Sequence, residues 1–390
     1  MTNWSGHVAI AGVNESSRRK APGVHPFEIQ AEVVLAALAD AGLTLADVDG
    51  FATAATLEAE GAGPFAIIEV AEYLGLRPTW IDSTDIGGAS PICHVGHAAA
   101  AIHAGLAEVV VVSYAANSYS SSVTWGERTE DVEREGPGQF EVPYGRTIPA
   151  AFALAATRHM HEYGTTPEQL AQVAVTCRDN AAKNPDARYR DPITVDDVLG
   201  GPVIASPFHR LDCCVVTDSG GAVVVTSLER ARDLPSTPAR LLGFGEAVHQ
   251  QWLNQADSFV STPGKTSGQR AFGQAGVAPA DIDVAQLYDA NTITPMLALE
   301  DLGFCKPGDA GPFIEDGGIS PAGVIPINTD GGGLSSNHPG RRGIFTVIES
   351  VRQLRGTGPG HQTDDPQLAL AHGFGGELSS CATLILGADS

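Results

Sequence analysis

The sequence has few of the features that would assign a chain to a specialised class. Its six cysteines form no Cys-x-x-Cys pair, so no zinc site is expected, and reduced, mostly buried thiols are predicted. No apolar run reaches the roughly 18 residues that a membrane helix needs. The first residues lack a basic segment before an apolar core, so no secretory signal is predicted. We therefore expect a cytoplasmic protein with no metal site and no contact with a membrane.

Basic residues are also scarce. The 390 residues contain 23 Lys and Arg against 46 Asp and Glu, which gives a formal net charge of −23. A nucleic-acid partner is not expected, because such a partner needs a basic face. An anionic ligand is still compatible with this charge, since a few local arginines and helix N-termini can hold a phosphate. Arg341-Arg342 could contact a phosphate in this way, or could be two solvated arginines at the start of a helix.

One feature that is present is a repeat across a long separation. Residues 41–49 read AGLTLADVD and residues 275–283 read AGVAPADID, with an offset of 234 positions (275 minus 41). A single long-range repeat indicates a duplicated unit rather than a short-period solenoid. The alternative is a coincidence between two turns that each end a helix.

The pattern along the chain predicts alternating strands and helices. Residues 7–13 and 108–114 are apolar and typical of buried strands, whereas 26–41 and 97–104 are predicted helices. This order favours a mainly parallel sheet. Residues 115–210 are more polar and are predicted to be an insertion covering one end of the sheet. We expect two halves, 1–235 with this insertion and 236–390.

Three glycine-rich turns are candidate site elements. They are Gly87–Ser90, Gly331–Gly340 and His372–Gly376, and the first two precede predicted helices. Backbone N–H groups at the start of a helix are free and lie at the positive end of its dipole, which suits a thioester oxyanion or a phosphate.

With these turns, the chain resembles the thiolase superfamily over nearly its full length. The resemblance rests on Gly331–Gly340 with its His338-Pro339-Gly340 end, on Ser219–Ser227, on Ala98–Gly105 followed by VVVV, and on His372–Gly376. It implies two βαβαβαββ halves packed as a five-layered αβαβα sandwich, with a loop domain inserted in the first half. It also implies that His338 binds the thioester oxygen or helps to move a proton.

The chain departs from the thiolases where their chemistry is carried. The family spacing places Gly88 where a thiolase has its nucleophilic cysteine, and Ser90 and Cys93 are only nearby. The thiolase Asn-Glu-Ala-Phe segment is replaced by 288–291, which begins Tyr288-Asp289. The resemblance thus implies that the usual acyl-transfer machinery is absent, unless the displaced Cys93 supplies a thiolate.

The altered pattern is similar to the lipid-transfer-type thiolase homologues that act as aldolases in steroid side-chain degradation. Shared stretches include Tyr288-Asp289, 299–304, 211–214 and 351–356. The resemblance implies retro-aldol cleavage of a β-hydroxyacyl-CoA, with no permanently bound cofactor. It also implies a homodimer and a small partner protein with an OB-fold and a zinc ribbon (DUF35 type). His338 stands where the steroid aldolases would carry a second tyrosine, which puts the steroid substrate in doubt.

The predicted site joins both halves of the chain. Tyr288, next to Asp289, is expected to act as acid or base, and His338 to polarise the thioester oxygen. The expected thioester-binding residues are Gly88, Ser90, His372, Gly375 and Gly376.

Each assignment has a structural alternative. Tyr288 could be a core tyrosine, His338 a turn residue and His372 a structural residue. Ser90 could be a helix N-cap, and Cys93 a buried small side chain. At the level of function, the alternatives to an aldolase are an acyltransferase that uses Cys93 and a non-catalytic acyl-CoA carrier or scaffold.

Overall fold

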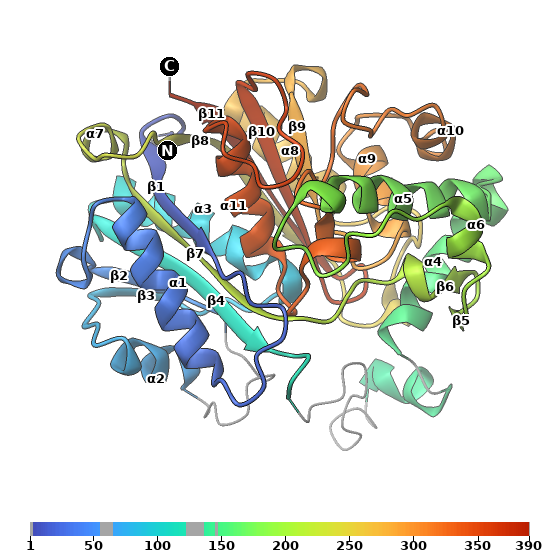
Figure 1. Cartoon of the computed structure of the whole chain (residues 1–390), viewed down its shortest axis with the longest axis horizontal. Coiled ribbons are helices and arrows are strands. Elements are labelled where there is room, and N and C mark those ends of the chain that lie inside the picture. The colour runs from blue at the N-terminus through green and yellow to red at the C-terminus, as the bar shows by residue number, and fades with distance from the viewer. Residues whose placement is uncertain (1–2, 55–64, 122–135, 145–146, 390) are drawn as a thin grey trace.

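The computed structural model describes residues 3–54, 65–121, 136–144 and 147–389 (Figure 1). Part of the insertion predicted at 115–210 lies outside these residues. The main sheet has the strand order β3-β2-β4-β7-β1-β8-β11-β10-β9. None of the described helices is long and apolar enough to cross a bilayer.

The first five strands of that order belong to the first half of the chain. Along the sequence, this half runs β1 (Val8–Glu15), α1 (Pro26–Asp40), β2 (Gly50–Ala52), α2 (Ala66–Tyr73), β3 (Trp80–Asp82), α3 (Ser90–His103), β4 (Val109–Asn117) and β7 (Asp218–Ser227). β7 is followed by the short helix α7 (Leu228–Arg232).

The second half repeats this order. It runs β8 (Ala239–Val248), α8 (Gly264–Ala275), β9 (Val284–Leu287), α9 (Ile293–Asp301), α10 (Ala310–Glu315), α11 (Gly343–Leu354), β10 (Leu368–Gly375) and β11 (Ser380–Ala388). Where the first half has β3, the second has a single parallel bridge between Ala285 and Ile327. Both halves therefore follow the βαβαβαββ order.

The halves pack as five layers. α1 and α2 cover one face of the first half-sheet, α3 and α11 lie between the two half-sheets, and α8 and α9 cover the outer face of the second. A short antiparallel pairing of β1 with β8 joins the two half-sheets into one strand order. The predicted thiolase-like αβαβα fold is confirmed. The sheet is not mainly parallel as expected, because five of its eight strand pairings are antiparallel.

The sequence repeat marks equivalent positions in the two halves. Gly42 and Gly276 each end a helix with positive φ, at 70° and 71°. The Asp49 carboxylate accepts from two backbone N–H groups at the entrance to β4, both at 2.9 Å. The Asp283 carboxylate accepts from two backbone N–H groups at the entrance to β10, both at 2.8 Å. The repeated residues thus fix the same helix-to-strand connection twice.

The segment between β4 and β7 folds against the other half. It contains α4 (Ile148–Tyr163), α5 (Pro167–Lys183), α6 (Val195–Leu199), β5 (Val203–Ala205) and β6 (Phe208–His209). α4 and α5 share a hydrophobic cluster with α9 and α10, and Figure 1 shows these helices side by side. The boundaries predicted for this insertion and for the two halves stay predictions.

Candidate active site

The Gly87-Gly88 turn is packed against the second half so closely that only glycine fits. A Cβ at Gly88 would lie 2.5 Å from two ring carbons of Tyr288 and 2.5 Å from the carbonyl oxygen of Phe374. A Cβ at Gly87, where φ is +79°, would lie 2.8 Å from the Gly376 nitrogen. The tyrosine ring therefore occupies the space that a side chain at position 88 would need.

Tyr288 follows β9 directly and is almost fully buried. Its backbone N–H donates to the His372 carbonyl at 3.0 Å, and its hydroxyl donates to the Gly340 carbonyl at 2.6 Å. Its ring meets the His338 ring edge-on, with centroids 5.4 Å apart. The structure therefore brings together Tyr288, His338 and the Gly88 turn.

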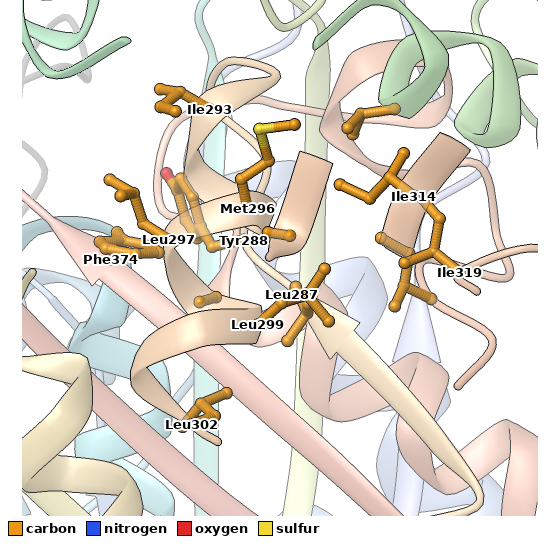
Figure 2. Close-up of a cluster of buried hydrophobic side chains, with 14 of the residues drawn as sticks. Leu287, Tyr288, Ile293, Met296, Leu297, Leu299, Leu302, Ile314, Ile319 and Phe374 are labelled. Atoms are coloured by element: carbon orange, nitrogen blue, oxygen red, sulfur yellow. The ribbon is translucent and has the colours of Figure 1, made fainter. Parts of the chain in front are cut away.

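Apolar side chains enclose the inner side of this tyrosine. Figure 2 shows Tyr288 among Met296, Leu297 and Phe374, within one buried cluster. α9, which supplies Met296 and Leu297, begins five residues after Tyr288. The ring is thus held in place, while its hydroxyl reaches the His338–Gly340 segment.

The His338–Gly340 segment is held by the first half of the chain. The Ser118 hydroxyl donates to the Pro339 carbonyl at 2.6 Å, and the Tyr114 hydroxyl donates to the same oxygen at 3.2 Å. The backbone N–H of His338 donates to the Thr217 hydroxyl at 3.0 Å. Residues in β4, just after it and just before β7 thus position a histidine that belongs to the second half.

The His338 imidazole is neutral at physiological pH. Burial, reinforced by the positive charge of Arg342, lowers its pKa to about 3. Its Nε2 atom is buried and has no hydrogen-bond partner among the described residues. A neutral imidazole with an unused nitrogen suits a hydrogen bond to a substrate oxygen.

Asp289 is turned away from the tyrosine beside it in the chain. Its fully buried carboxylate accepts from the N–H groups of Gly333 and Leu334 at 2.7 and 3.1 Å. It also pairs with the Arg342 guanidinium at 3.1 Å. Burial raises the pKa of Asp289 above its ordinary value. Arg342 and the two N–H donors oppose this shift but do not cancel it. The predicted catalytic carboxylate is therefore engaged in holding the glycine-rich loop.

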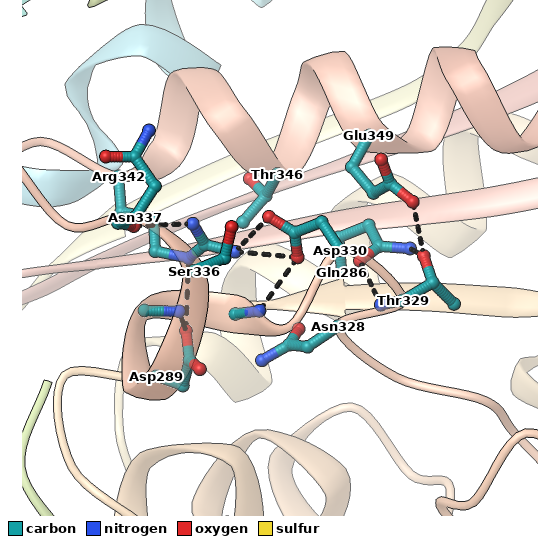
Figure 3. Close-up of polar contacts among 12 residues, drawn as sticks. Gln286, Asp289, Asn328, Thr329, Asp330, Ser336, Asn337, Arg342, Thr346 and Glu349 are labelled. Carbon is teal, nitrogen blue, oxygen red and sulfur yellow. Dashed lines mark hydrogen bonds and ion pairs between the residues drawn. The ribbon is translucent and has the colours of Figure 1, made fainter. Parts of the chain in front are cut away.

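Arg342 is the centre of this buried network, which sequence reasoning missed. Figure 3 shows its guanidinium between Asp289 and Asp330, and both Asp330 oxygens lie 3.0 Å from its Nη2. Asp330 holds the pKa of Arg342 above its ordinary value despite burial. Arg341 pairs with Asp85 at 2.6 Å. Neither arginine is one of a solvated pair, and both are engaged by carboxylates.

Ser90 lies at the predicted turn, but its hydroxyl is used within that turn. α3 begins at Ser90 itself, earlier than the predicted 97–104, so the serine is not the N-cap. Its hydroxyl donates to the Gly87 carbonyl at 2.7 Å and accepts from the Ile86 N–H at 2.9 Å. These bonds shape the turn that carries Gly88.

His372 is not brought to the Gly88 turn. Successive side chains of a strand point to opposite faces. Gly373 faces α3, whereas the His372 imidazole faces α8, with Nδ1 2.9 Å from the Thr383 hydroxyl. Burial lowers its pKa to about 3. The expectation that this side chain binds the thioester is not supported, although its backbone carbonyl positions Tyr288.

Cys93 lies in the core between the half-sheets. Its side chain is fully buried in the cluster that contains α3 and α11. Burial, followed by the negative charge of Glu246, raises the pKa of the thiol. A nucleophilic cysteine needs the opposite shift. Among the described residues, no three His, Cys, Asp or Glu side chains gather in the way a metal site requires.

Comparison with known proteins identifies the family. Residues 245–388 match the model described as thiolase C-terminal domain-like. A steroid side-chain-cleaving aldolase of Thermomonospora curvata is 36% identical over 402 aligned positions, which cover all of both chains. This chain belongs to the thiolase superfamily.

Two further similarities place it within that superfamily. The 17-hydroxy-3-oxo-4-pregnene-20-carboxyl-CoA lyase of Mycobacterium tuberculosis is 37% identical over 367 positions, which cover 90% of this chain and 92% of that one. The solved "Ltp2-ChsH2(DUF35) aldolase" superposes with a TM-score of 0.90 at 35% identity, covering 100% of this chain and 99% of that one. The predicted lipid-transfer-type branch, with its steroid-cleaving aldolases, is confirmed.

Proposed function

We propose that this thiolase-superfamily chain is a CoA-thioester aldolase, a carbon–carbon lyase that splits a β-hydroxyacyl-CoA by retro-aldol chemistry. The observation that carries the proposal is the Tyr288 ring within 2.5 Å of the Cβ position at Gly88. A nucleophilic side chain at position 88 and a tyrosine at this place exclude each other. The site therefore offers acid–base chemistry where a thiolase forms an acyl-enzyme.

The reaction needs one proton to move and one bond to break. In its ionised form, the Tyr288 oxygen accepts the proton of the β-hydroxyl group. The β-carbon becomes a carbonyl as the bond between the α- and β-carbons breaks, and its electron pair moves onto the thioester as an enolate. The protonated Tyr288 then returns the proton to the α-carbon. The products are a ketone or aldehyde and a shortened acyl-CoA, so atoms and electrons balance without a covalent intermediate.

The enolate oxygen needs donors that are in place before the reaction. The neutral imidazole of His338 donates a hydrogen bond to this oxygen, as its low pKa of about 3 favours. Backbone N–H groups of the Gly88 and Gly375 turns are the further proposed donors. One such donor contributes about 3–4 kcal/mol to transition-state stabilisation in a site that excludes water.

Asp289 and Arg342 act as positioning residues in this proposal. Their buried ion pair, completed by Asp330, fixes the loop that precedes His338. A rigid loop keeps the imidazole at the distance where its hydrogen bond stabilises the enolate.

The substrate and the partner protein are inferred from the steroid-cleaving aldolase branch of the superfamily. Two relatives are named for steroid substrates, so a CoA thioester with a steroid-type acyl group is the proposed substrate. A solved relative is named with a DUF35 protein, and we propose a partner of that type here. A homodimer and a cytoplasmic location stay predictions. The CoA thioester serves as substrate and no bound cofactor is invoked.

A matched pair of tyrosines tests the catalytic role. The hydroxyls of Tyr288 and Tyr114 both donate to carbonyls of the Pro339-Gly340 segment. Tyr288→Phe should lower kcat about 100-fold or more, as expected for loss of an acid–base group. Tyr114→Phe should keep most of the activity, because the Ser118 hydroxyl still donates to the Pro339 carbonyl at 2.6 Å. Equal, small losses in both variants would reject the assignment of Tyr288.

Cysteine substitution separates the aldolase from the alternative functions. Cys93→Ala should leave carbon–carbon cleavage near wild type, with a modest loss of stability from the core. An inactive Cys93→Ala that is as stable as wild type, together with an acyl group trapped on Cys93 in the wild type, would establish the acyltransferase. Wild-type protein that binds acyl-CoA but cleaves no β-hydroxyacyl-CoA, even with a DUF35 partner, would favour the carrier.

A further inference from the structure

Three segments that are distant in sequence bring cations and tyrosines together beside the candidate site. Lys20 Nζ lies 5.4 Å from the centre of the Tyr119 ring, and the Arg188 guanidinium lies 4.9 Å from the same centre. Arg188 is also 5.3 Å from the Tyr189 ring, which the Arg178 guanidinium approaches at 5.5 Å. These five residues are called the cationic cluster.

The charges of the cationic cluster are not neutralised in the part of the chain that the structure describes. There, neither Lys20 nor Arg188 forms an ion pair, whereas the neighbouring Arg18 and Arg19 pair with Glu32 and Glu15. The Arg188 Nε atom is buried and has no acceptor among these residues. Two cations over one ring repel each other. In a chain with a net charge of −23, this gathering of cations points to an anionic ligand.

The cluster is built on a buried carboxylate. Asp218 is fully buried and accepts from the N–H groups of Ala21 and Tyr119, at 2.6 and 2.8 Å. These two bonds hold the segments that carry Lys20 and Tyr119 side by side. Because its oxygens are occupied by backbone donors, Asp218 fixes the positions of the cations without pairing with them.

The cluster adjoins the loop that carries His338. The backbone N–H groups of Arg188 and Tyr189 donate to the carbonyls of Ser336 and Ser335, both at 3.0 Å. On the other side, the residue before Tyr119 is the serine that donates to the Pro339 carbonyl at 2.6 Å. The cluster is therefore joined by hydrogen bonds to both sides of the loop that carries His338.

We propose that the cationic cluster binds the phosphate groups of the nucleotide end of the CoA thioester, a proposal that rests on the proposed function. Lys20 and Arg188 form charge-assisted hydrogen bonds with these phosphates. Tyr119 and Tyr189 are 41% and 48% exposed, so a ligand can reach the cluster from solvent. The cluster holds the nucleotide end of CoA while His338 holds the thioester.

Equilibrium binding to the full chain tests this site without a catalytic assay. CoA is the probe, measured by titration calorimetry. Arg188→Ala and Lys20→Ala should each raise the Kd of CoA about tenfold, and added salt should weaken wild-type binding more than binding by either variant. Lys306→Ala, an exposed lysine on the second half, is the control and should leave the Kd unchanged. Arg188→Lys, which retains the charge, should recover part of the affinity.

Truncated ligands show which part of CoA meets the cluster. Pantetheine lacks the phosphates and the adenine, so its affinity should be the same in wild type and in Arg188→Ala. Unchanged CoA affinity in both alanine variants, equal losses for CoA and pantetheine, or no measurable binding of CoA to the wild type would each overturn the proposal. If the binding results hold but the protein cleaves no β-hydroxyacyl-CoA, the proposed function fails and the phosphate site stands.

Discussion

The two halves of the molecule share a backbone plan but differ in what they bring to the site. The first half contributes mainly bare backbone, the Gly87-Gly88 turn at the start of α3. The second half contributes Tyr288, His338 and a buried ion-pair network. The equivalent helices α3 and α11 meet at their starts, since a Cβ at Gly343 would lie 2.5 Å from the Gly88 carbonyl oxygen.

This difference shows how a duplicated fold can divide the work of one site. At the site, the first half supplies closely packed glycines, while the second half supplies the buried ion pairs. The second half also buries Glu349 on α11, which accepts from the Thr329 hydroxyl at 2.6 Å. Burial raises the pKa of this carboxyl group to about 8, so it is mostly uncharged at neutral pH. Because ion pairs lie on one side of the site and glycines on the other, the two halves should be sensitive to different kinds of mutation.

Among the tests of this difference between the halves, Arg342→Met has the largest expected effect. The substitution removes the charge that neutralises Asp289 and Asp330, both fully buried. Leaving buried carboxylates unpaired should lower the free energy of unfolding by about 3–5 kcal/mol. Urea unfolding of wild type and variant measures the change. A loss below 1 kcal/mol would mean that the network contributes little to the second half.

Gly88→Ala breaks the contact between the halves from the other side. The added methyl group would meet the Tyr288 ring at 2.5 Å, so the ring must move. A displacement of this size should lower kcat about 100-fold. Its effect on the free energy of unfolding should be smaller than that of Arg342→Met. Gly273→Ala is the matched control, because a Cβ there meets nothing within 4 Å and the position is helical. Wild-type kcat in Gly88→Ala would refute the close-packing account of the site.

The sequence predicted those parts of the fold that depend on periodic patterns. The repeat at 41–49 and 275–283 predicted the duplication, because Asp49 and Asp283 form the same local bonds in each half. The glycine turns and Tyr288 were predicted from motifs, and the structure places Gly88 and Tyr288 in contact. Local patterns and family motifs were thus sufficient to predict the fold and the position of Tyr288 in the site.

Features that depend on three-dimensional packing could not be predicted in this way. His372 was expected at the thioester, but strand alternation directs its imidazole toward α8. Arg342 gave no signal beyond a pair of adjacent arginines, since its partners Asp289 and Asp330 are 53 and 12 residues away. Asp218 joins the segments that carry Lys20 and Tyr119, and spacing along the chain does not reveal that contact.

The pH dependence of the free energy of unfolding tests a contact between the two halves that His97 makes. His97 Nδ1 lies 2.6 Å from Asp82 of the first half, and its Nε2 lies 3.1 Å from Glu246 of the second. These carboxylates raise the pKa of His97 to about 9. Because the folded-state pKa is raised, the stabilisation is complete below the ordinary value of about 6.5 and is lost as pH rises through 9.

His97→Gln should therefore cost about 1 kcal/mol at pH 6 and almost nothing at pH 10. Unfolding free energies of wild type and variant across this pH range give the difference. A cost that does not change with pH would show that the protonated imidazole is not what links Asp82 to Glu246.

The smallest expected effect compares the two copies of the repeat directly. Asp49→Asn and Asp283→Asn each keep an acceptor oxygen but remove the charge that strengthens two backbone hydrogen bonds. Each should lower the free energy of unfolding by about 0.5 kcal/mol, with the larger loss at the half-buried Asp49 than at the exposed Asp283. Because the two sites share no hydrogen-bond partner, the double variant should show the sum. Neutral behaviour in one half alone would mean that the duplicated residue has lost its structural role there, as the two halves have already diverged in chemistry.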